Sequence, residues 1–159
     1  MTDKLNQIGL DNRASKELSD KLNELLANYQ IFYMNARGFH WNIKGEKFFE
    51  LHAKFEDLYN DSLEKIDEIA ERILTLGFTP LHNYEDYSGI SKIKASKNVS
   101  GGKDAVQAIL DGYKVLLPLE RELLEMAGES NDEGTGALMS DYIREQEKLV
   151  WMYSAFLNK

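Results

Sequence analysis

Apolar residues recur at helical spacing through most of this chain, while the strict alternation typical of strands is nearly absent. Apolar positions three and four residues apart predict four long amphipathic helices, over about residues 11–39, 46–76, 102–127 and from 136 almost to the end. Asp11 or Ser15 is expected to cap the first helix, and Gly77 to end the second. Pro118 lies inside the third, so a kink or local break is expected there.

The connection between the second and third helices, residues 78–100, is too long for a tight turn. We expect it to cross the molecule and to carry a short helix within residues 88–97. Two long helices, one long crossover and two more helices predict an all-α four-helix bundle of the ferritin-like arrangement. The length of 159 residues suits a single domain over residues 1–159.

Composition narrows the function. The chain has no cysteine, so any metal site must use His, Asp and Glu, and disulfides are excluded. A formal net charge of −8 argues against binding nucleic acid through the overall electrostatic field. The chain has no leader-like start and no uncharged apolar stretch near the ~20 residues that span a bilayer. We therefore expect a soluble, cytoplasmic protein without a membrane partner.

The second predicted helix carries the residues best suited to chemistry. Two pairs stand one helical turn apart on it: His52 with Glu56, and Asp67 with Glu71. All four fall within about 100° of one another on a helical wheel. The same flank carries Phe49 and Leu74, so it is partly apolar, and something is expected to cover it.

These pairs also have ordinary structural explanations. Charged pairs four residues apart are common on exposed helix faces, and a histidine among aromatic residues is commonly packed in a core. His52 and Asp67 stand 15 positions apart, which is about 22 Å along a helix. A single centre therefore needs a second, antiparallel copy of the helix in a two-fold dimer. The alternative is two independent weak sites, or none.

Four motifs are similar to those of one known family. The chain reads HWNIKG at residues 40–45, FFELHAKFEDLY at 48–59 and DEIAER at 67–72, and it closes with WMYSAFL at 151–157. This pattern resembles the Dps family (DNA-binding protein from starved cells), the miniferritins. With the first helix, the resemblance covers nearly the whole chain.

The resemblance implies a hollow dodecamer that oxidises Fe(II), preferentially with hydrogen peroxide but also with oxygen as a candidate oxidant. The protein would store the ferric iron as a mineral and so protect the cell against oxidative stress. It also implies a ferroxidase centre between two-fold-related subunits, with His40 and His52 from one and Asp67 and Glu71 from the other. Glu56 matches an acidic family position and is either a ligand or a neighbour of the ligands.

Trp41, beside His40, either takes part in electron transfer at the centre or packs in the interface. The alternative function is a DNA-compacting protein, but residues 1–9 contain a single lysine, Lys4, which argues against tight DNA binding. A lysine cluster at the end of the crossover and the start of the third helix is interpreted as a solvated loop face: Lys92, Lys94, Lys97 and Lys103. Four acidic residues suit either iron-entry pores or, for the first two, a helix start: Asp132, Glu133, Asp141 and Glu145.

Overall fold

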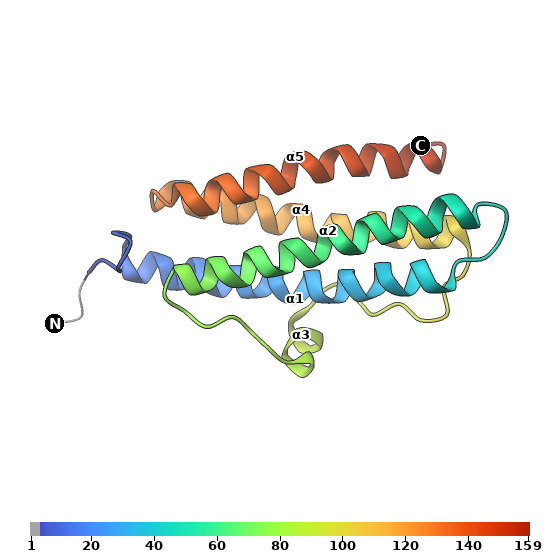
Figure 1. Ribbon diagram of the computed structural model, residues 1–159. Helices are drawn as coiled ribbons and strands as arrows, with labels where there is room; N and C mark the ends of the chain where they lie inside the picture. Colours follow the sequence, from blue (N-terminus) through green and yellow to red (C-terminus); the bar gives the residue numbers. More distant parts are fainter. Residues whose placement is uncertain (1–3) are drawn as a thin grey trace.

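The computed structural model of the protein describes residues 4–159, and the first three residues, within the lysine-poor N-terminal segment, lie outside it. The described chain forms five helices and no strand of a sheet (Figure 1). Their bounds are α1 Asn12–Asn42, α2 Phe48–Thr75, α3 Tyr84–Ile90, α4 Gly102–Glu129 and α5 Glu133–Phe156. The four long helices form the predicted bundle, which confirms the all-α fold class.

α1 and α2 form an antiparallel pair joined by a short turn (Figure 1). Asp11, one of the two predicted caps, accepts a hydrogen bond from the backbone N–H of Ala14 at 2.9 Å and begins α1. In the turn, Gly45 has a φ of 111°, a conformation that side chains disfavour. The turn brings the end of α1 next to the start of α2.

The crossover does contain a short helix, but the predicted position is wrong. α3 spans Tyr84–Ile90 and lies beside α1 (Figure 1). It begins at Tyr84 because the Asn83 side chain caps it by accepting a hydrogen bond from the N–H of Asp86 at 2.9 Å. Beyond α3, the backbone N–H groups of Lys92 and Ile93 donate to the side-chain oxygen of Asn28 at 2.9 and 3.1 Å. These bonds tie the segment to α1 instead of continuing a helix.

Of the kink or local break predicted at Pro118, the break is wrong, because α4 is continuous across this residue. Proline removes one backbone hydrogen bond, but Leu116 and Leu119 on either side of it are buried in the core, where packing holds the helix. α5 begins before the predicted start, at Glu133, because Asp132 caps it by accepting from the N–H of Thr135 at 3.0 Å.

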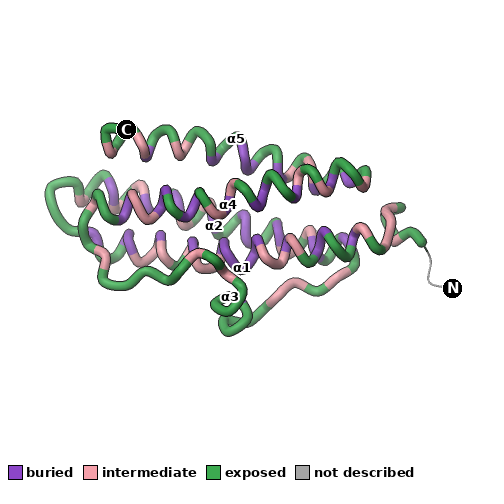
Figure 2. Tube along the Cα trace, turned by 180° about the vertical axis from the view of Figure 1, so that it is seen from behind, coloured by how far each residue is buried: buried purple, intermediate pink, exposed green. Residues whose placement is uncertain are grey.

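Buried residues line the interior faces of the helices (Figure 2), as the apolar periodicity predicts. α2 differs because it also has apolar side chains in solvent. Phe49, Leu63 and Leu74 are 80%, 49% and 57% exposed. Leu63 follows the apolar spacing of the helix, yet its side chain is exposed in the single copy. No helix within residues 4–159 is long and apolar enough to cross a membrane.

Candidate metal centre

Two histidines meet at the turn between α1 and α2. His40 lies in the last turn of α1 and is buried, and His52 lies in the second turn of α2. Their rings stack with centroids 3.8 Å apart and planes 15° from parallel. The antiparallel packing of the two helices thus brings together two candidate ligands that are 12 residues apart in the chain.

Each histidine is oriented by the backbone of the other. Nδ1 of His40 lies 2.7 Å from the carbonyl oxygen of His52, and Nδ1 of His52 lies 2.7 Å from the carbonyl oxygen of His40. A carbonyl oxygen only accepts, so both Nδ1 atoms carry the proton. In the neutral rings, the lone pair of each Nε2 is therefore available to a metal. Hydrogen bonds of this kind fix the tautomer of metal-binding histidines.

Aromatic side chains surround the histidine pair. Phe48 stacks on His52 at 4.9 Å, and the edge of Tyr59 meets His40 at 5.2 Å. The Arg37 guanidinium lies 5.5 Å from the Tyr59 ring and 5.0 Å from the Trp41 ring. Trp41 itself is 59% exposed beside His40, so it is free to meet another surface.

The three carboxylates predicted as ligands stay exposed on α2 and do not join the histidines. Glu56 lies one turn beyond His52, whereas Asp67 lies about 22 Å from His52 along the helix axis. Within residues 4–159, no three His, Asp or Glu side chains of one copy come together to hold a metal ion. One copy thus brings together two candidate ligands, and a complete metal site would need further ligands from elsewhere.

The exposed apolar residues of α2 lie on the same flank as these carboxylates. On a helical wheel centred on His52, Leu63, Leu74 and Phe49 fall at about 20°, 40° and 60°, among the acidic positions. Apolar patches that stay in solvent commonly mark interaction surfaces. The flank expected from the sequence to need a cover is thus uncovered in the single copy.

The far end of α2 is fixed to the start of α5. Arg72, next to Glu71, forms an ion pair with Asp132 at 2.6 Å and donates to the hydroxyl oxygen of Thr135 at 2.9 Å. A Cβ atom on Gly134 would lie 2.7 Å from this guanidinium, so the glycine permits the close approach. The Asp132 side chain is 1% exposed, and this confirms the helix-start interpretation for that residue.

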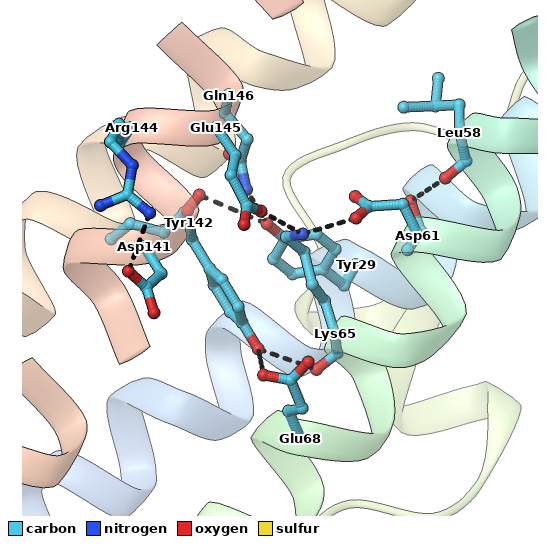
Figure 3. A network of polar contacts seen from close by, with 12 residues as sticks. Tyr29, Leu58, Asp61, Lys65, Glu68, Asp141, Tyr142, Arg144, Glu145 and Gln146 are labelled. Carbon is cyan, nitrogen blue, oxygen red and sulfur yellow. Dashed lines mark hydrogen bonds and ion pairs between the residues drawn. The ribbon is translucent and has the colours of Figure 1, made fainter. Parts of the chain in front are cut away.

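A second polar system joins α2 to α5, and sequence reasoning missed it (Figure 3). The buried ammonium group of Lys65 bonds to both Asp61 and Glu145 at 2.8 Å. Burial lowers the pKa of Lys65, but these two bonds outweigh it and raise the pKa above its usual range. Glu145, one of the predicted pore residues, is therefore already paired with a cation.

Glu120 in α4 is the other residue that the sequence reasoning missed, and it is fully buried. The sequence contains a signal for it, because it follows Tyr113 and Leu116 at the apolar spacing of α4.

In the crossover, one member of the lysine cluster, Lys92, pairs with Glu24 at 3.4 Å.

The donor set suits iron. Imidazole nitrogens and carboxylate oxygens both bind Fe(II), and carboxylates favour the ferric state. Two histidines fixed as Nδ1–H tautomers and an exposed acidic flank are present in each copy. An antiparallel copy would bring Asp67 and Glu71 to the histidines and cover the apolar flank in one step.

Comparisons with known proteins agree with the fold. The ferritin-like domain model matches residues 19–159. A DNA protection during starvation protein of Porphyromonas gingivalis is 40% identical over 87% of this chain and 87% of its own length. The crystal structure of a Dps protein from Vibrio cholerae, described as a member of a broad superfamily of ferritin-like diiron-carboxylate proteins, is 55% identical, covers 99% of both chains and has a TM-score of 0.97. A Dps protein from Bacillus brevis is 30% identical over 91% of this chain and 97% of its own, with a TM-score of 0.88. This chain belongs to the Dps family of ferritin-like proteins.

Proposed function

We propose that this protein is a ferroxidase that oxidises Fe(II) and stores the ferric product inside a closed shell of identical subunits. Family membership supports iron storage and protection in general. The observation that carries the finer proposal is the histidine pair. Each ring is held by the other's backbone, and each keeps an Nε2 lone pair for a metal.

The active site forms between two copies. If α2 of one copy lies antiparallel to α2 of another, so that His52 faces Asp67, the two-fold axis passes near the midpoint between them, at Asn60. Each interface then holds two equivalent centres. At each centre, His40 and His52 come from one subunit, and Asp67 and Glu71 come from its partner. Burial of Phe49 and Leu63 in the same interface stabilises the dimer.

The residues have distinct tasks at this centre. The histidines bind Fe(II) through Nε2, and the partner's carboxylates add negative charge that favours Fe(III) as it forms. Glu56, one turn from His52, either binds a second iron or holds a ligand in place. A site with few protein ligands leaves positions open for the oxidant. Trp41 lies beside the centre, where the same interface would cover its exposed ring.

Hydrogen peroxide is the proposed oxidant, and oxygen is the alternative. Peroxide accepts one electron from each of two Fe(II) ions and, with two protons, leaves as two waters. The pairwise transfer releases no hydroxyl radical, which accounts for protection against oxidative stress. A formal charge of −8 per chain attracts Fe(II) to the shell, for which we propose the dodecamer of the family.

Removing both histidines tests the proposal directly. In the double variant His40→Ala with His52→Ala, the rate of Fe(II) oxidation by peroxide should fall by more than about 100-fold, because both imidazole ligands are lost. The rate is measured by the absorbance of ferric product after anaerobic Fe(II) loading. The control is His82→Ala, which removes the exposed histidine of the crossover and should oxidise iron like the wild type. A double variant as fast as that control would refute the assignment of the site.

A further inference from the structure

A carboxyl group lies in the interior of the bundle, away from the candidate metal centre. Glu120 of α4 is 0% exposed and meets side chains from the other long helices. Tyr29 comes from α1 and Gln146 from α5, and Figure 3 shows both beside Lys65 of α2. The proposed oxidation of iron uses none of these four residues.

The hydrogen bonds run in one direction through this group. The amide nitrogen of Gln146 donates to the hydroxyl oxygen of Tyr29. The hydroxyl group of Tyr29 in turn donates to Oε1 of Glu120, with the oxygens 3.4 Å apart. At the two ends of this series of hydrogen bonds, one buried atom each lacks a partner within residues 4–159: Oε2 of Glu120 and Oε1 of Gln146.

The count of donors decides the protonation state. An ionised Glu120 would leave two buried acceptors and no donor for either, and burying unpaired polar groups is costly. A proton on Oε2 removes the buried charge and provides a donor for the Gln146 side chain, which lies near enough to Glu120 to affect its pKa. The neutral acid therefore fits the observed partners better than the carboxylate does.

Cations near Glu120 are engaged elsewhere. The Lys65 ammonium binds Asp61 and Glu145, and Arg121 pairs with Glu147 at 2.9 Å on the surface. Among the described residues, no lysine or arginine forms an ion pair with Glu120. The other titratable neighbours are phenols, which carry no positive charge: Tyr29 of α1, Tyr113 of α4 and Tyr142 of α5.

We propose that Glu120 is a neutral carboxylic acid that closes this network, and that its ionisation in alkaline solution loosens the packing of α4 against α1 and α5. The proposal stands apart from the iron chemistry and adds a pH-sensitive element to the bundle. Burial raises the pKa of Glu120 to about 8 from 4.5, although the Tyr29 hydroxyl group, the nearby Gln146 side chain and the charges of Lys65 and Arg121 partly offset it.

The sign of the pH effect follows from these two values. Between pH 4.5 and about 8, the folded chain keeps the Glu120 proton while the unfolded chain loses it. Over this interval, the contribution of Glu120 to the folding equilibrium falls about tenfold per pH unit. The stabilisation is complete below the lower value and lost above the higher one.

The variant Glu120→Gln tests the proposal, because a neutral amide reproduces the neutral acid. Its oxygen can accept from Tyr29, and its nitrogen can donate to Gln146. We expect the melting temperature of the variant to exceed that of the wild type above about pH 8, with a difference that shrinks toward about pH 5. The control is Glu125→Gln, an exposed position of the same helix, which should follow the wild type.

A variant that melts below the wild type at every pH would overturn the proposal, since that result means an ionised and paired Glu120. Infrared spectroscopy of the wild type gives an independent test that requires no variant. The carbonyl stretch of a protonated carboxylic acid should be present near pH 6.5 and lost by about pH 9. Its absence near pH 6.5 would equally overturn the proposal. Iron oxidation by Glu120→Gln should match that of the wild type.

Discussion

The histidine pair and the Glu120 network are both polar groups held inside a mostly apolar bundle, but they end differently. At the α1–α2 turn, Nδ1 of His40 and Nδ1 of His52 each donate to the backbone carbonyl oxygen of the other residue. These two bonds do not involve Nε2 of either ring. In the interior, Tyr29 links Gln146 to Glu120, and one added proton completes the set. The first system is incomplete in one copy, whereas the second is complete within it.

The difference shows where each system acts. Groups that must be satisfied within the fold are buried by it, because an unpaired buried polar group destabilises the folded chain. Polar groups that bind a ligand or another subunit can stay at the surface, where water forms hydrogen bonds with them in the absence of that partner. Asp67 and Glu71 are exposed on α2, and exposed apolar side chains lie on the same flank.

A charge in the proposed interface should separate the two systems most sharply. The register that places His52 opposite Asp67 also places residue 63 opposite Glu56 of the other copy, so Leu63→Glu would bring two like charges together, and like charges in an interface cost several kcal/mol. We expect the dimer and iron oxidation to be lost together, with oxidation reduced more than about tenfold. The single chain should stay helical, because Leu63 is 49% exposed and contributes little to the core. Size-exclusion chromatography and circular dichroism measure the two properties.

Leu5→Glu is the matched control for this variant, because Leu5 is 53% exposed but lies outside α2. It should assemble and oxidise iron like the wild type. If Leu63→Glu kept its assembly and its full oxidation rate, the flank of α2 would not be the interface.

A smaller effect is expected from the interior. Tyr29→Phe removes the hydroxyl group that links Gln146 to Glu120 and leaves further buried polar atoms unpaired. The free energy of unfolding should fall by about 1–3 kcal/mol. Chemical denaturation at neutral pH measures it. Oxidation of iron at saturating Fe(II) should not change, and a variant that lost oxidation while keeping its stability would contradict the separation of the two systems.

Periodicity predicted the helices well because apolar spacing reports directly on which face is buried. It failed where single polar side chains decide the path of the backbone. Asn83 begins α3, and Asn28 holds the segment after it against α1, and neither bond leaves a pattern in the sequence. At Pro118, local preference predicted a kink or a break, and the break is absent where core packing holds the helix on both sides.

For the candidate site, the role of the residues named from the sequence stays a prediction, and the sequence did not show their geometry. The helical rise already placed His52 and Asp67 too far apart for one copy, and the structure agrees. The reciprocal bonds of His40 and His52 are invisible in the sequence, because each depends on a backbone carbonyl of another helix. Leu63 follows the apolar spacing yet is exposed, because spacing alone does not distinguish a core face from an exposed apolar face.

The central claim is that the metal centre takes its ligands from two copies, and mixing two inactive variants tests it most directly. One variant carries His40→Ala with His52→Ala, and the other carries Asp67→Asn with Glu71→Gln. Co-expressed in equal amounts, they form mixed dimers in half of the pairings, and each mixed dimer has one intact centre of its two. The account predicts a return to about a quarter of the wild-type oxidation rate, although each variant alone is inactive. A mixed assembly as inactive as either variant would contradict it.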